Sequence, residues 1–182
     1  MKVLETPLSE KTVRSLKLGD VVYVSGSIIT GRDEMHLRAL ESRDKAADRI
    51  KNAVIFHCGP IVTGGDGKWE IIAAGPTTSA RMNSTAPEII RRYNVRALIG
   101  KGGMSEGTSR AMADTGCVYL AATGGAAVSL AGSLTAEGVE WADLGMAEAM
   151  WLLMAERLGP LIVAMDSKGN SLYENVRKDL RF

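Results

Sequence analysis

The sequence predicts one α/β domain with a mixed β-sheet, and three observations indicate this. A run rich in β-branched residues at 21–30 and a short apolar run at 117–121 are typical of strands. In the second half, helical patterns at 85–93 and 105–114 alternate with short apolar runs, which predicts βαβ crossovers and parallel strands. In the first half, two apolar runs flank a glycine-rich turn at 64–67, which predicts a β-hairpin.

The length of 182 residues favours a single domain over 1–182, with room for a small appended element. The first half is expected to contain hairpins and one main helix. Asp33 is the candidate N-cap of that helix, which is expected to run to about Lys51 because its apolar positions form a helical stripe. The other elements expected there are an extended segment at 1–19 with a turn at 18–20, a strand at 21–30 interrupted at Gly26, a short strand at 53–56, and the two hairpin strands at 60–63 and 69–74, the second of them buried.

In the second half, Thr85-Ala-Pro opens a helix, since proline is tolerated in a first turn. Parallel strands at 95–99 and 117–121 are expected on either side of the helix at 105–114. Residues 146–158 have strong helix propensity. A strand at 161–165 and a turn at 166–169 follow, and residues 170–176 could close another hairpin.

Composition excludes several classes of protein. A net charge of +1 leaves no surplus of cations for a nucleic-acid or polybasic membrane surface. No apolar stretch reaches the roughly 18 residues that a membrane-spanning helix needs. The first residues lack the apolar core of a signal peptide, so a cytoplasmic location is expected.

The two cysteines, Cys58 and Cys117, lie in apolar surroundings and are interpreted as small buried residues in a reducing compartment, with a disulfide as the alternative. Two thiols cannot by themselves hold an iron–sulfur cluster or a closed zinc site. The two histidines, His36 and His57, add no recognisable ligand spacing. No metal site is expected on this chain, and a metal would have to come from another chain.

Three cations lie in the turns that follow predicted strands. Arg32 follows Gly31, Arg81 lies in Gly75-Pro-Thr-Thr-Ser-Ala-Arg-Met82, and Lys101 lies in Gly100-Lys-Gly-Gly-Met104. Ligands of open α/β sheets bind at the carboxyl ends of strands, and arginine can grip a carboxylate with two parallel hydrogen bonds. More than one cation at such an edge indicates a binding site for a dianion. The alternative interpretation is that the three cations are exposed charges in loops.

Two further features leave alternatives open. The hydroxyls of Thr77, Thr78 and Ser79 could cap a turn, or one of them could hold or deprotonate a substrate, although no activating neighbour is visible. His36 could be a buried core histidine or a partner that orients an arginine or the substrate. A nucleotide site is disfavoured, because the glycines at 100–103 match neither the dinucleotide fingerprint nor the P-loop.

Four motifs occur in the same order in one known family. They are Gly-Arg-Asp-x-x-His at 31–36, Gly-Pro-Thr-Thr-Ser-x-Arg-Met at 75–82, Gly-Lys-Gly-Gly-Met at 100–104 and Asp-x-Lys-Gly-Asn-Ser at 166–171. From about Leu4 to Val176 the chain resembles the β subunit, or C-terminal domain, of iron–sulfur class I fumarases and L(+)-tartrate dehydratases.

The resemblance implies a swivelling β/β/α domain that closes over an α part, whose three cysteines hold a [4Fe–4S] cluster. It implies that Arg32, Arg81 and Lys101 bind the substrate carboxylates together with His36, and that Thr77 and Lys101 are catalytic. It also implies a strand at 151–158, against the helix propensity.

The expected function is therefore the β subunit of a two-subunit hydro-lyase that hydrates fumarate reversibly to L-malate. It would be inactive without its α partner and would assemble as α2β2 or a similar oligomer. The alternatives are the β subunit of L(+)-tartrate dehydratase and, from another class, a non-catalytic domain that binds dicarboxylates.

Overall fold

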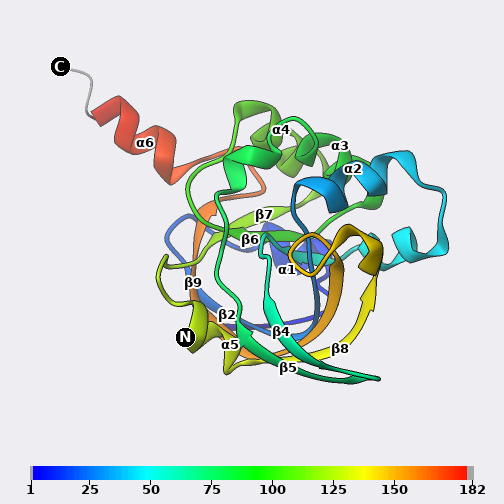
Figure 1. The fold of residues 1–182 in the computed structure, drawn as a ribbon. Coiled ribbons are helices and arrows are strands. Elements are labelled where there is room, and N and C mark those ends of the chain that lie inside the picture. Colours follow the sequence, from blue (N-terminus) through cyan, green and yellow to red (C-terminus); the bar gives the residue numbers. More distant parts are fainter. Residues whose placement is uncertain (1, 180–182) are drawn as a thin grey trace.

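The computed structural model describes residues 2–179, and its centre is a closed ring of strands (Figure 1). In this ring each strand pairs with the next and the last pairs with the first. The ring strands are β2 (Val21–Thr30), β3 (Val54–Phe56), β6 (Ala97–Gly100), β7 (Val118–Ala121) and β9 (Met150–Met165). Two more strands extend the sheet, β1 (Lys2–Glu5) beside β2 and β8 (Leu134–Glu140) beside β9. A separate hairpin consists of β4 (Ile61–Gly65) and β5 (Lys68–Ala73).

The sheet is mixed, as the sequence predicts. Strands β1, β2, β3, β6 and β7 run parallel, whereas β9 is antiparallel to β2, β7 and β8. The interruption expected at Gly26 is a register shift in the pairing of β2 with β9. The strands expected at 95–99 and 117–121 are confirmed as β6 and β7, with starts shifted by one or two residues.

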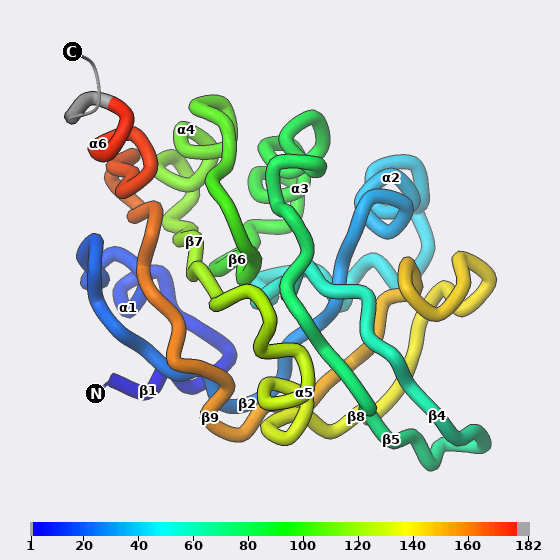
Figure 2. Tube along the Cα trace, turned by 60° about the vertical axis from the view of Figure 1, so that its left-hand side comes forward, coloured from blue at the N-terminus to red at the C-terminus, as the bar shows by residue number. Residues whose placement is uncertain are grey.

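Three helices cover one outer face of the ring and lie in a row in both views (Figure 2). They are α2 (Asp33–Glu41), α3 (Ala86–Tyr93) and α4 (Glu106–Thr115). The shorter helices are α1 (Glu10–Arg14) and α5 (Ala127–Ala131), while α6 (Leu172–Asp179) projects from the body. Short 3₁₀ turns complete the description at η1 (Lys45–Ile50), η2 (Ser79–Met82) and η3 (Ala142–Leu144).

Alternate side chains of the ring strands enter two different cores. On β6, Ala97 and Ile99 join the cluster that fills the ring, while Leu98 joins the cluster beneath the helices. Ile89 and Ile90 of α3 are fully buried in that second cluster. Because apolar side chains fill the inside of the ring, a polar ligand has to bind at one of its ends.

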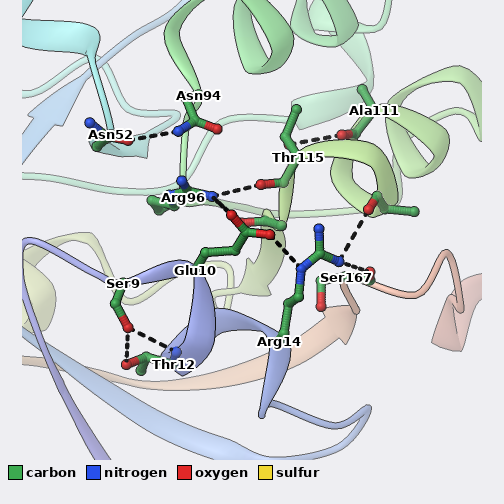
Figure 3. Close-up of polar contacts among 12 residues, drawn as sticks. Ser9, Glu10, Thr12, Arg14, Asn52, Asn94, Arg96, Ala111, Thr115 and Ser167 are labelled. Atoms are coloured by element: carbon green, nitrogen blue, oxygen red, sulfur yellow. Dashed lines mark hydrogen bonds and ion pairs between the residues drawn. The ribbon is translucent and has the colours of Figure 1, made fainter.

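A network of polar contacts closes the end at which the parallel strands begin (Figure 3). Arg96 precedes β6, is only 7% exposed and donates to the carbonyl groups of Thr115 and Gly116. Glu10 of α1 lies between Arg96 and Arg14, with ion-pair distances of 3.8 and 2.7 Å. This network ties α1 to the start of β6, and the opposite end carries the cations described below.

The first half departs from the sequence prediction at its helices. The helix expected from Asp33 to about Lys51 is two elements, because Ser42 is extended and Asp44 caps η1 by accepting from the Ala46 N–H. Its N-cap is Arg32 and not Asp33. The segment at 1–19 also contains β1 and α1, whose N-cap Ser9 accepts from the Thr12 N–H. Strand β5 is confirmed in place, but it is half-exposed and not buried.

The last third contains the largest departure from local propensity. Residues 150–165 form the long strand β9, so the helix propensity at 146–158 is misleading and the strand implied by the resemblance is confirmed. Pairing with β2, β7 and β8 outweighs a propensity of a few tenths of a kcal/mol per residue. The hairpin expected over 170–176 is wrong, because α6 forms there and only Ser171 bridges back to Met165. None of the helices within residues 2–179 has the length and apolarity needed to cross a bilayer.

Candidate functional site

The carboxyl ends of four parallel strands meet at one edge of the ring. Arg32 lies two residues beyond β2, His57 directly follows β3, and Lys101 directly follows β6. This is the edge at which α/β sheets bind ligands.

The Thr77–Ser79 segment is inserted between the ends of β3 and β6. The Thr77 N–H donates to the His57 carbonyl at 2.8 Å, and the Lys101 N–H donates to the Thr77 carbonyl at 3.3 Å. The Ser79 N–H donates to the Lys101 carbonyl at 3.0 Å. The two glycine-bounded turns that the sequence singles out therefore lie side by side at the same end of the sheet, as predicted.

Two of the predicted cations are accessible to a ligand. The side chain of Arg81, in η2, is 52% exposed, and its Nη2 lies 3.0 Å from Oδ2 of Asp33 in the first turn of α2. Lys101 is exposed and forms no ion pair within residues 2–179. Both positive groups therefore lie at the surface, where an anion can contact them.

Arg32 is held more tightly than the other two cations. Its Nε lies 3.2 Å from Oε1 of Glu148, and each side chain is about one-fifth exposed. The contact has the distance of an ion pair but not the angle of a hydrogen bond, so the Nε–H has no hydrogen-bond partner in the described part of the chain. The other oxygen of Glu148 accepts from the Glu34 N–H at the start of α2, at 3.1 Å. Gly59 makes room for this guanidinium, since a Cβ there would lie 2.6 Å from Nη1.

Thr77 is half-buried, and its hydroxyl makes no hydrogen bond within residues 2–179. The N-cap residue of η2 is Thr78, which makes no side-chain capping bond. A capping role, one of the two interpretations of these hydroxyls, therefore has no support in the described geometry. The Thr77 hydroxyl is therefore free to contact a ligand.

His36 is fully buried on α2, whereas Arg81 and Lys101 are exposed. Its Nδ1 lies 3.1 Å from Thr85 Oγ1, and its ring stands edge-on to His57 with centroids 5.5 Å apart. Burial lowers the pKa of His36 to about 4, although the Asp33 charge opposes the shift. Burial also lowers the pKa of His57 well below 6.5, and both rings are neutral at pH 7.

Sequence reasoning assigns no role at this site to three residues of the region, Glu148, His57 and Tyr119. Glu148 lies beside Arg32. His57 and Tyr119 form a buried trio with Ser79, whose hydroxyl lies 2.8 Å from the His57 ring and 3.0 Å from the Tyr119 hydroxyl. The sequence singles out Ser79, because it belongs to the same glycine-bounded turn as Thr77, but the other three come from distant strands and loops.

The thiols of the chain do not suit a metal cluster. Cys58 is packed in the core inside the ring and Cys117 in the core under the helices, and both are free. Burial raises the pKa of Cys58 to about 12 and raises that of Cys117 as well, which disfavours the thiolate form that binds metals. Within residues 2–179, no three or more His, Cys, Asp and Glu side chains lie together as a metal site would require.

Comparisons with known proteins agree on one family. The sequence model of the family described as "Fumarase C-terminus" matches residues 2–176. A Methanocaldococcus jannaschii protein, provisionally named L(+)-tartrate dehydratase subunit beta, is 47% identical over 176 residues, with 94% of this chain and 90% of that protein covered.

Two further relatives extend the comparison. The L(+)-tartrate dehydratase subunit beta of Escherichia coli K12 is 36% identical over 178 residues, covering 97% of this chain and 89% of its own length. A Geobacillus stearothermophilus protein, provisionally named fumarate hydratase class I, is 43% identical over 177 residues, which span 96% of this chain but 34% of that longer protein. The chain therefore belongs to the fumarase C-terminus family, together with these tartrate dehydratase and class I fumarate hydratase relatives.

Proposed function

We propose that this chain is the β subunit of a two-subunit [4Fe–4S] hydro-lyase that hydrates fumarate reversibly to L-malate. The observation that carries the proposal is the joining of the Thr77–Ser79 segment to Lys101 at the edge that also presents Arg32 and Arg81. A four-carbon dicarboxylate has two anionic ends, and cations from three separate elements can bind them.

Each of these residues has a role in the proposed reaction that follows from its chemistry. Arg81 and Lys101 bind substrate carboxylates from the exposed edge, and Arg32 adds a third positive group from the start of α2. Lys101 also stabilises the negative charge that develops next to a carboxylate when the neighbouring carbon loses its proton. Thr77 places its hydroxyl beside Lys101 to take that proton, after a base of the α partner has removed the proton of the hydroxyl itself. His36, which is buried on α2, supports the positions of these side chains.

An iron–sulfur cluster has to come from a partner in this proposal, because the two thiols of the chain are buried and lie in separate cores. When bound, such a cluster supplies an open iron that acts as a Lewis acid toward the substrate hydroxyl. The α partner holds it with three cysteines, and this chain closes over it as a swivelling domain in an α2β2 or similar assembly. The names of two relatives, which call them β subunits, support the existence of a second subunit.

L(+)-tartrate is the second candidate substrate, and a specific observation favours it. The two relatives whose own length is 90% and 89% covered carry the tartrate dehydratase name, whereas only 34% of the fumarate hydratase relative is covered. Both substrates are four-carbon dicarboxylates, so the same three cations serve either reaction. The α partner would then contribute the contacts that distinguish them.

The test is co-expression with the α partner followed by anaerobic assays on fumarate, L-malate and L(+)-tartrate. We expect hydration or dehydration by the pair, and neither activity nor a visible iron–sulfur absorption band from the β chain alone. A pair that binds these dicarboxylates but converts none of them would favour a non-catalytic binding domain. Turnover or a bound cluster in the chain alone would contradict the two-subunit proposal.

A further inference from the structure

A set of buried polar side chains lies directly under the candidate site and is not explained by substrate binding. Ser79 is fully buried, and its hydroxyl lies 2.8 Å from His57 Nδ1 and 3.0 Å from the Tyr119 hydroxyl. On the other side, His36 Nδ1 lies 3.1 Å from Thr85 Oγ1. The rings of His36 and His57 face each other edge-on, and each leaves its Nε2 buried without a hydrogen-bond partner in the described structure.

The tautomer of His36 follows from Thr85. The Thr85 hydroxyl has one proton, and it donates this proton to the Met82 carbonyl at 3.3 Å. Its oxygen can therefore only accept from the imidazole, so His36 carries its proton on Nδ1. The Nε2 of His36 is then a buried acceptor.

The tautomer of His57 follows from Ser79 and Tyr119. Tyr119 donates to the Ser79 oxygen, which leaves the Ser79 proton for His57 Nδ1 and puts the imidazole proton on Nε2. The opposite direction would leave the Nε2 atoms of both rings as buried acceptors without a donor. The assigned direction instead presents one donor, His57 Nε2–H, and one acceptor, His36 Nε2, on adjacent rings.

These side chains hold the backbone that carries the proposed catalytic groups. Ser79 lies between Thr77 and Arg81 and bonds through its backbone to Lys101. Gly100 is pressed against the centre of the network, because a Cβ there would lie 1.9 Å from Ser79 Oγ and 3.0 Å from the Tyr119 hydroxyl. Any shift of the Ser79 hydroxyl is therefore transmitted to the residue before Lys101.

We propose that two hydrogen-bonded sets, Tyr119–Ser79–His57 and His36–Thr85, pack together through their edge-on imidazoles as one buried network, with His57 as the Nε2–H tautomer and His36 as the Nδ1–H tautomer, and that this network positions Thr77, Arg81 and Lys101. These five are positioning residues, since all are buried beneath the edge. The kinetic part of this inference rests on the proposed hydro-lyase function, whereas the tautomers and the backbone order do not.

The first test is nuclear magnetic resonance of the full chain labelled with ¹⁵N on histidine, alone or mixed with unlabelled partner. The chain has two histidines, so four ring nitrogens give the whole spectrum. At about pH 7.5 we expect a protonated Nε2 on His57 and a protonated Nδ1 on His36, with neither ring titrating near the ordinary value of about 6.5. The same tautomer on both rings, or a ring that titrates normally, would overturn the network.

The second test is Ser79→Ala beside the control Ser109→Ala. Ser109 is also a buried serine, but its hydroxyl donates to the Gly169 carbonyl and touches none of the proposed site residues. In the assembled enzyme Ser79→Ala should lower kcat/KM by at least ~10-fold, about 1.4 kcal/mol, and Ser109→Ala should stay within ~3-fold. In Ser79→Ala the His57 ring should become a mixture of tautomers and the amide protons of Thr77 and Lys101 should exchange faster.

Tyr119→Phe keeps the test decisive if Ser79→Ala does not fold. It removes one donor but leaves Ser79 bonded to His57, and an Nε2–H on His57 still avoids two buried Nε2 acceptors. The His57 tautomer should therefore persist, and kcat/KM should fall less than in Ser79→Ala. Equal losses in the Ser79 and Ser109 variants, with unchanged amide exchange, would refute the positioning role. An assembled enzyme inactive on every dicarboxylate would refute the proposed function, while the ring and amide signals would still decide the network.

Discussion

Ser79 and Lys101 are joined through their backbones, the Ser79 N–H donating to the Lys101 carbonyl at 3.0 Å. The bond belongs to an isolated parallel bridge between Thr78 and Lys101, which extends the edge of β6 by one short segment. A turn that carries a hydroxyl and an arginine is thus fixed against a turn that carries a lysine. A substitution that displaces one turn should therefore disturb the other.

Removal of either exposed cation should impair the assembled enzyme. Arg81→Ala or Lys101→Ala should lower kcat/KM by at least ~10²-fold, because a charged hydrogen bond to substrate in a closed site contributes about 1.5–3 kcal/mol or more. Arg81→Lys should also be poor, since lysine lacks the two-pronged geometry. Arg43→Ala removes an exposed arginine outside the site and should be near neutral. Steady-state kinetics that show equal effects for Arg81→Ala and Arg43→Ala would reject the assignment.

Thr77→Val removes the hydroxyl but keeps the side chain nearly the same shape, so this variant tests proton transfer. Because the Thr77 hydroxyl has no hydrogen bond within residues 2–179, the free energy of unfolding should change by less than ~0.5 kcal/mol. The kcat should collapse, and exchange of the substrate carbon-bound proton with deuterated solvent should stop. Thr63→Val, on exposed strand β4, is the control that should keep both. Normal exchange in Thr77→Val would show that this chain binds the substrate carboxylates but takes no part in proton transfer.

Gly100→Ala should destabilise the chain by about 1–3 kcal/mol, because the added methyl group overlaps Ser79 Oγ in a filled interior. Gly107→Ala offers a matched comparison in α4, where the nearest atom would lie 3.8 Å from the new Cβ. That change should stabilise the helix by about 0.5–1 kcal/mol. Urea denaturation of both variants measures the contrast, and two variants of equal stability would disprove the close packing.

The Glu148 carboxylate beside Arg32 should contribute more to the free energy of unfolding than an exposed carboxylate does. Glu148→Ala leaves a partly buried guanidinium unpaired and removes the acceptor of the Glu34 N–H, so it should cost about 1–3 kcal/mol. Asp143→Ala breaks another contact to α2, the pair with Arg38, but Asp143 is 65% exposed and should cost about 0–1 kcal/mol. Thermal unfolding distinguishes them, and a larger loss in Asp143→Ala would contradict the argument.

Stability should fall as the pH falls below about 6.5, because both imidazoles bind protons more weakly in the folded than in the unfolded chain. The contribution is fully present above the unfolded pKa and is lost as the pH drops from 6.5 toward 4. For His36 alone the total is about 3 kcal/mol, from a shift to about 4. His36→Gln should flatten this part of the pH profile in denaturation experiments. An identical slope in wild type and His36→Gln would show that His36 is not buried in its neutral form.

The position of the candidate site follows from local signals in the sequence. Glycines after apolar runs mark the ends of β2 and β6, so the residue order alone places Arg32 and Lys101 at a sheet edge. The helix expected over 33–51 is too long, because Ser42 and Asp44 are capping residues whose preference overrides the apolar stripe. Strand β9 cannot be found from propensity, since three partner strands decide its conformation.

The buried network could not be predicted from the sequence, for a similar reason. His57 comes from the end of β3, Tyr119 from β7 and His36 from α2, and only the closed fold brings their polar atoms together. Glu148 lies in the turn before β9, a region whose local propensity points to helix. Side chains that meet from separate strands and a helix leave no periodic pattern along the chain.

Closure of the ring has a consequence for how a second subunit can attach. Each of the five ring strands is bonded on both sides, so the backbone around the ring offers no unpaired row of N–H and C=O groups to a foreign strand. Unpaired strand edges within residues 2–179 occur only at β1, β8 and the β4–β5 hairpin. A partner that completes the cation-lined edge therefore meets it end-on, through side chains and turns, and can separate from it without breaking a β-ladder.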